Sequence, residues 1–168
     1  MYLITVAAEG KPSIEFTAVA WLISNQKQVM LEIFHSFVRH DVKSMLSDGF
    51  GRQIVHGIPM KHVLRHGRTR SALRKELNQF HEKYEHCPII IDEKNCLHQL
   101  YLKKFQLTAF SMDGNKCVMI PWLEEFCPPI NHRKKTSGRH SDYRCSLKRA
   151  WKLGMVYGTS HGYHVVNG

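Results

Sequence analysis

The chain has 168 residues, which is about the length of one domain and enough to bury a single sizeable core. Hydrophobic residues make up 43% and charged residues 23%, and these fractions exclude wholesale disorder and collagen-like repeats. The net charge is +10 with the twelve histidines neutral, an excess that favours nucleic acid or an anionic surface as the partner. A basic globular protein without such a partner is the alternative.

The chain shows no sign of export or membrane insertion. No run of 18 apolar residues occurs, and the first residues lack the basic segment of a secretory signal. The five cysteines are an odd number without a C-x-x-C pair, so we expect reduced thiols rather than a disulfide framework. We expect one domain over residues 1–158 and a C-terminal tail over 159–168.

Three strands are predicted first, at residues 2–6, 14–23 and 30–38. The second is apolar at nearly every position, which is typical of a strand covered on both faces. The third places Leu31, Ile33, His35 and Phe37 on one face. Short polar turns separate the strands, so the pattern predicts an antiparallel meander.

Helices and further strands are expected to alternate after this meander. Residues 39–70 contain four glycines and four histidines and indicate a loop with short helical pieces. Leu73, Leu77, Phe80 and Tyr84 recur at the spacing of an amphipathic helix over 71–84. The apolar run 89–91 is typical of a buried parallel strand.

The last third of the chain predicts a helix over 97–105, a strand over 116–120 and a short helix over 121–126. A final helix begins near Tyr143 and ends near Gly154 or Gly158. The order β-β-β-α-β-α-β-α-α predicts an α/β fold: a mixed sheet of about five strands, a three-strand antiparallel meander plus parallel strands, flanked by helices. This is the layout of the ribonuclease H-like fold.

Five segments resemble, in order, the landmarks of DEDDh-type 3′–5′ exonucleases: residues 14–19, 34–38, 56–58, 88–91 and 100–102. In that family four acidic residues hold two divalent metals and a histidine is the general base. Here the carboxylates are largely missing. The Asp-x-Glu motif is replaced by Glu15-Phe16-Thr17, an aspartate position falls near His98, and the final His-x4-Asp ends at Cys145 after His140. Magnesium prefers oxygen ligands, so we expect the two-metal exonuclease activity to be lost.

A narrower resemblance is to the Maelstrom domain, a ribonuclease H-fold module of the piRNA pathway whose Glu-Cys-His-Cys set binds zinc. It is carried by residues 12–18, 32–37 and 56–59, and by His140 followed by 145–147 and Trp151. The resemblance implies that Glu15, His140 and Cys145 hold a structural zinc. The family's first cysteine is missing before His140, so Cys127 or His132 is the expected fourth ligand of a tetrahedral site.

Structural alternatives to the metal site stay open. A carboxylate in an apolar strand costs free energy unless it is paired, so Glu15 could instead bind Arg144 or Arg149. Cys145 could be a buried thiol in a helix interface, and His140 could cap that helix. In that case the chain binds no metal.

Basic residues cluster at 61–75, 103–104 and 133–152. Arginine pairs with phosphate through two parallel hydrogen bonds, and the candidate nucleic-acid-binding residues are Arg65, Arg68, Arg70, Arg133, Lys134, Lys135 and Arg139. A solvated basic surface is the alternative. Tyr101, Phe105, Trp122 and Trp151 could stack bases, but their helical spacing favours the core.

The expected function is single-stranded RNA binding in piRNA-guided transposon silencing, by a monomer that works with piRNA-pathway proteins in perinuclear granules and the nucleus. The resemblance also implies a metal-independent RNA endonuclease activity in some members. No catalytic residue can be assigned, and His35, His56 and His62 are guesses. The alternatives are an interaction scaffold for an acidic protein and a working nuclease.

Overall fold

The computed structural model describes residues 1–9, 15–39, 60–84, 87–92, 107–110 and 146–166. The predicted meander is present. It consists of β1 (Tyr2–Glu9), β2 (Glu15–Ser24) and β3 (Lys27–Arg39), each antiparallel to the next. Asn25 and Gln26, with φ of 50° and 61°, form the two-residue turn between β2 and β3, and this left-handed conformation matches the twist of a tight hairpin.

Four further strands complete a mixed seven-stranded sheet in the order β4-β3-β2-β1-β5-β6, with β7 also paired to β3. β5 (Ile89–Asp92) runs parallel to β1, and β6 (Leu107–Phe110) runs parallel to β5. The two short strands β4 (Arg68–Thr69) and β7 (His164–Val166) pair in parallel with the end and the start of β3. The sheet therefore has more strands than the five expected, because short segments without periodicity pair along the exposed edge of β3.

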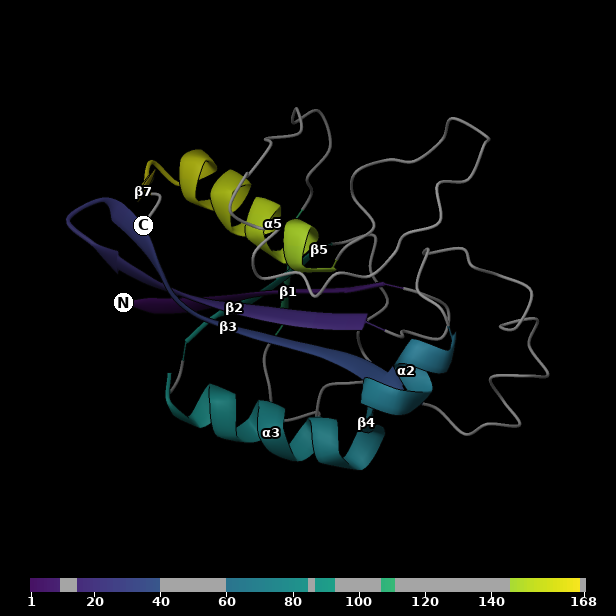
Figure 1. The fold of residues 1–168 in the computed structure, drawn as a ribbon. Helices are drawn as coiled ribbons and strands as arrows, with labels where there is room; N and C mark the ends of the chain where they lie inside the picture. The colour runs from purple at the N-terminus through teal and green to yellow at the C-terminus, as the bar shows by residue number, and fades with distance from the viewer. Residues whose placement is uncertain (10–14, 40–59, 85–86, 93–106, 111–145, 167–168) are drawn as a thin grey trace, which may run out of the picture.

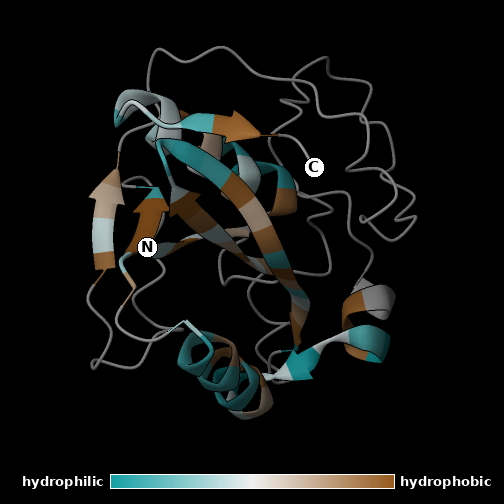
Figure 2. Cartoon of the chain, turned by 90° about the vertical axis from the view of Figure 1, so that its left-hand side faces the viewer, coloured by the Kyte–Doolittle hydropathy of each residue, from teal (hydrophilic) through white to brown (hydrophobic). Residues whose placement is uncertain are grey.

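Two helices cover opposite faces of the sheet (Figure 1). α3 (Arg70–Glu82) begins after Thr69, whose side chain accepts a hydrogen bond from the Ala72 amide. α3 buries Leu73, Leu77 and Phe80, as its periodicity predicts. In Figure 2 α3 lies below the sheet, and much of its outer side is hydrophilic.

α5 (Ser146–Ser160) packs on the other face of the sheet. Its Trp151 is fully buried against Trp21 of β2, with ring centroids 4.7 Å apart, so Trp151 belongs to the core as expected. A Cβ added at Gly154 would lie 2.2 Å from a ring carbon of Trp21. The glycine therefore permits close helix–sheet contact and does not end the helix, which continues to Ser160, near the other expected end at Gly158.

A β-bulge changes the expected face of Leu31. Trp21 pairs with Met30 and Ala20 pairs with Glu32, so Leu31 has no residue opposite it on β2. As a result Leu31 is 43% exposed, while Phe37 further along β3 is buried.

Some expected elements cannot be compared with the structure. The helices over 97–105 and 121–126 and the strand over 116–120 lie outside the described residues. In the described part of the basic stretch 39–70, residues Met60–His66 form the short helix α2, as expected for that segment. Among the described helices, none is long and apolar enough to cross a membrane.

Candidate functional site

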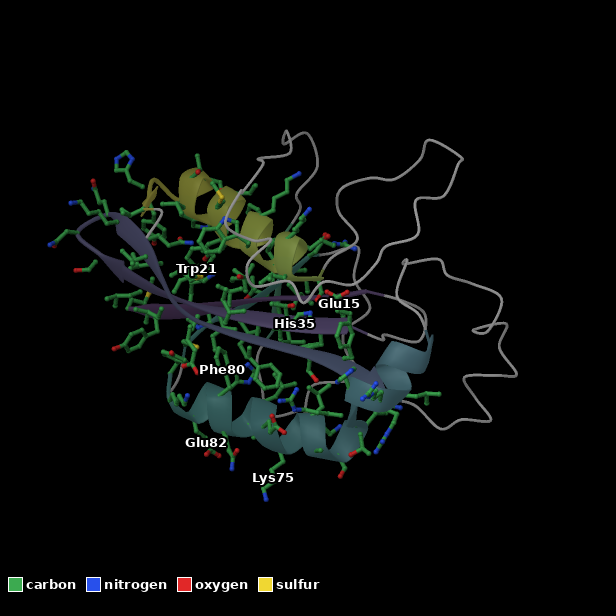
Figure 3. The ribbon with its side chains drawn as sticks, in the orientation of Figure 1. Glu15, Trp21, His35, Lys75, Phe80 and Glu82 are labelled. Carbon is green, nitrogen blue, oxygen red and sulfur yellow. The ribbon has the colours of Figure 1, made fainter. Side chains whose placement is uncertain are left out.

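Buried polar side chains gather at one edge of the sheet. β1, β3 and β5 all end at this edge, and β2 begins there, as the strand pairings require. The start of α5 lies at the same edge, because Ser146 contacts Glu15. Figure 3 shows Glu15 and His35 near the start of this helix.

The Glu15 carboxylate is the centre of this polar group and is only 1% exposed. Its Oε1 accepts hydrogen bonds from the Ser146 amide at 2.8 Å, the Ser146 hydroxyl at 2.7 Å and His35 Nε2 at 3.1 Å. A carboxylate oxygen only accepts, so His35 carries its proton on Nε2. The Ser146 hydroxyl donates to Glu15, and therefore Thr17 donates the 2.7 Å hydrogen bond that joins it to Ser146.

This environment keeps Glu15 ionised. Burial alone would raise the pKa of the carboxyl group, but the hydrogen bond and charge of His35 and the two hydrogen bonds from Ser146 outweigh burial. The pKa is therefore lowered from its ordinary value of 4.5. The positive end of the α5 dipole acts in the same direction.

Asp92 provides a second buried carboxylate, at the end of β5. Arg149 of α5 donates a 2.7 Å hydrogen bond to its Oδ2, and Asp92 is 4% exposed. Arg144 and Arg149 are the alternative partners that the sequence offers for Glu15, and Arg144 lies outside the described residues. The structure joins Arg149 to Asp92, and it joins Glu15 to His35 and Ser146.

The sequence did not single out Ser146 or Asp92 as members of this group. Asp92 carried a usable signal, because an acidic residue directly follows the apolar run 89–91. His35 was named only as a catalytic guess, and its contact with Glu15 depends on long-range pairing between β2 and β3. The other two histidines of that guess differ in placement: His56 is not among the described residues, and His62 lies on α2.

Only Glu15 of the expected zinc ligands can be placed. His140, Cys145, Cys127 and His132 lie outside the described residues. Within the part of the chain that is described, no group of three or more histidine, cysteine, aspartate or glutamate residues could hold a metal. The expected ligands together offer the thiolate, imidazole and carboxylate groups that zinc prefers. In the described structure, the Glu15 carboxylate accepts three hydrogen bonds from His35 and Ser146, and a zinc ion bound there would compete with them.

The described arginines of the basic run differ in their environments. Arg65 of α2 and Arg70 of α3 are exposed. Arg68 bonds Glu76 through Nε at 2.9 Å and the Ser36 hydroxyl at 3.0 Å, and its guanidinium lies 5.7 Å from the Phe34 ring centroid. Arg133, Lys134, Lys135 and Arg139, like the aromatic residues Tyr101, Phe105 and Trp122, lie outside the described residues.

No protein-family model, curated protein or solved structure matches this chain.

Proposed function

We propose that this chain is a Maelstrom-type domain of ribonuclease H-like fold that binds single-stranded RNA and has lost two-metal exonuclease chemistry. The fold assignment is supported by the strand order β3-β2-β1-β5-β6 at the centre of the sheet. Three of these strands form an antiparallel meander, two are parallel to β1, and helices lie on both faces.

The proposal depends on which groups bond the two buried carboxylates at the sheet edge. Two-metal hydrolysis needs several carboxylates that face two cations about 4 Å apart. Among the described residues, both buried carboxylates have protein donors instead: Glu15 binds Ser146 and His35, and Asp92 binds Arg149. These donors support a structural role for the carboxylates and argue against a magnesium cage.

RNA binding is supported by charge. The chain has a net charge of +10, and the exposed Arg39 ends β3 two residues after Phe37, the pairing partner of Glu15. The exposed Arg70 directly follows β4, which pairs with the same end of β3. Because the Maelstrom resemblance places related domains in the piRNA pathway, we place this chain in small-RNA-guided transposon silencing. Its proposed partners are RNA and other proteins of that pathway, in perinuclear granules and the nucleus.

A salt titration tests RNA binding. The anisotropy of a labelled single-stranded RNA should rise with protein at low salt, and log K should fall linearly with log salt at about −0.7 per neutralised phosphate. No binding at low salt would contradict the proposal. Displacement of the RNA by an equal charge of polyglutamate would favour the alternative scaffold for an acidic protein.

We further propose a structural zinc ion held by Glu15, His140 and Cys145, with Cys127 or His132 as the fourth ligand. Elemental analysis of the purified protein should then give about one zinc per chain. Cys145→Ser should lose the zinc, whereas the control Cys87→Ser should keep it. A wild-type protein without zinc would contradict the metal site and leave RNA binding to be judged by the titration.

A further inference from the structure

Four aromatic rings gather where α5 ends. They belong to Phe110 of β6, to Tyr157 in the last turn of α5, and to His161 and Tyr163 just after this helix. The His161 ring stacks on the Tyr157 ring with centroids 3.9 Å apart, and the Tyr163 ring centroid lies 6.2 Å from that of His161. In both pairs the ring planes are inclined by only 24°. Phe110 meets Tyr157 edge-on at 5.4 Å, and these four residues form the aromatic cluster.

The backbone after α5 fixes the position of the last two rings. Gly162 adopts the left-handed conformation, with φ of 75°, and its amide donates a 3.2 Å hydrogen bond to the Thr159 carbonyl. The Tyr163 amide donates a 2.8 Å hydrogen bond to the Gly158 carbonyl. These two bonds make a Schellman motif, which turns the chain back over the last turn of a helix. The motif therefore holds the Tyr163 ring beside the His161 ring.

The His161 ring is held in place although its side chain is exposed. Its Nδ1 lies 2.8 Å from the Tyr157 carbonyl oxygen, which only accepts, so Nδ1 carries a proton and donates. The ring also stacks on the Tyr157 side chain. A surface ring that is already fixed in the free protein loses little conformational freedom when a ligand stacks on it.

Burial in the core does not account for the whole cluster. Phe110, Tyr157 and Tyr163 are half-buried and pack at the margin of the hydrophobic core, so part of each ring remains accessible to solvent. His161 is exposed, and its stacking therefore buries little surface in the core. Trp151, which the sequence offered as a base-stacking candidate, is fully buried and cannot reach a base.

The charge around the cluster favours a nucleotide base as the ligand. Residues 146–166 contain no acidic side chain. Lys27 and His164, which pair in the β3–β7 ladder directly after the cluster, are both exposed. The carbonyl end of a helix carries a partial negative charge, so a phosphate or an acidic peptide is disfavoured directly against the end of α5. The uncharged face of a base suits this position, and the phosphate of the same nucleotide can lie toward Lys27.

Resting on the proposed RNA binding, we infer that the aromatic cluster is a base-stacking site for single-stranded RNA, with the exposed His161 ring at its surface. Bases stack on tyrosine, phenylalanine and histidine side chains, and this stacking tolerates any sequence because every base has a π face. Ser146 lies beside Glu15, and a helix rises 1.5 Å per residue, so Tyr157 is about 17 Å further along α5. The cluster is therefore a second contact for the strand, separate from the basic sheet edge.

Removal of single rings tests the stacking site. At a fixed low salt concentration, His161→Ala and Tyr163→Ala should each weaken the binding of a labelled single-stranded RNA about 5- to 150-fold, the range found when a stacking aromatic residue is replaced by alanine. Tyr163→Ala removes no charge, so it should leave the salt slope of binding unchanged. Tyr163→Phe keeps the ring and should bind RNA like wild type.

Tyr2→Ala is the matched control. Tyr2 is an exposed tyrosine whose ring contacts Tyr84, directly after α3, and α3 covers the face of the sheet opposite to α5 (Figure 1). The same substitution there should leave RNA binding unchanged. His161 is exposed, so His161→Ala should also match wild type in thermal unfolding, and it tests the site even where Tyr163→Ala loosens the fold.

A strand of the same length and backbone that lacks bases separates stacking from charge. Wild type, His161→Ala and Tyr163→Ala should bind this base-free strand equally, and wild type should bind it more weakly than RNA. If wild type binds both strands equally, or the two variants bind RNA like Tyr2→Ala, the stacking site is wrong and RNA binding stands. A His161→Ala variant that loses affinity for both strands would also overturn the site. If wild type does not bind RNA at low salt, the proposed function fails and the stacking site fails with it.

Discussion

Replacing Glu15 with glutamine tests the role of the buried carboxylate in the fold. Glutamine keeps the shape of the side chain and one acceptor oxygen, but it removes the negative charge. Three donors converge on Oε1, two from Ser146 and one from His35. Charge-assisted hydrogen bonds contribute about 1.5–3 kcal/mol each, roughly twice the contribution of neutral ones.

The expected loss follows from these three bonds. Halving their strength would cost about 3 kcal/mol, and relief from burying a charge offsets part of this loss. We therefore expect Glu15→Gln to lower the free energy of unfolding by about 2 kcal/mol at pH 7. For a domain of this size that loss corresponds to a fall in melting temperature of about 4–8 °C.

The loss should also depend on pH. The pKa of Glu15 is lowered in the folded state, so the ionised carboxylate stabilises the fold fully above its ordinary value of 4.5. This contribution disappears as the pH falls through the lowered pKa, because the carboxyl group is then protonated in both the folded and the unfolded chain. The difference between wild type and Glu15→Gln should therefore shrink as the pH falls below about 4.5.

Urea unfolding at several pH values measures both effects. Glu32→Gln is the control: the Glu32 side chain is 37% exposed and pairs with Lys83, so its loss should cost less than about 1 kcal/mol. A Glu15→Gln variant as stable as wild type at pH 7 would refute the reasoning. A loss of unfolding free energy that is as large below pH 4 as at pH 7 would also refute it.

Two further predictions concern packing and thiol reactivity. Gly154→Ala should lower the free energy of unfolding by about 1–3 kcal/mol, because the new Cβ would lie 2.2 Å from the Trp21 ring. Thermal unfolding measures this loss, and an unchanged melting temperature would show that α5 is not held so close to β2. Burial raises the pKa of the Cys87 thiol to about 11, so peptide mass spectrometry should find Cys87 alkylated by iodoacetamide far more slowly at pH 8 than in the urea-unfolded chain. Equal rates in the two states would contradict the burial of Cys87.

The elements that the sequence predicted well are those in which burial follows from a local pattern of apolar residues. The second strand is apolar at nearly every position, and β2 is indeed covered by a helix on each face. The helix over 71–84 was predicted from four apolar positions, and α3 occupies Arg70–Glu82. In α3 the spacing of the apolar residues indicates which side is buried, whereas the unbroken apolar run of β2 indicates that both faces are buried.

The features that the sequence did not predict depend on contacts between distant segments. β6 and β7 are short and lack a clear period, and they become strands by pairing with β5 and β3. Glycine often ends helices, so the sequence predicts a helix end near either Gly154 or Gly158. The helix ends at Ser160, near the second of these, and the nearby Trp21 ring explains the glycine at position 154. The partners of Glu15 lie 20 and 131 residues away in the chain, so no local pattern could have named them.

The central claim is that this chain binds single-stranded RNA at a sheet edge that no longer supports metal-dependent trimming. The most direct measurement incubates 5′-labelled single-stranded RNA with the purified protein, with magnesium or with a chelator, and records both the bound fraction and the length of the RNA. The account predicts that RNA is bound at low salt and is not shortened stepwise from its 3′ end in magnesium. A ladder of progressively shorter products that requires magnesium would contradict it.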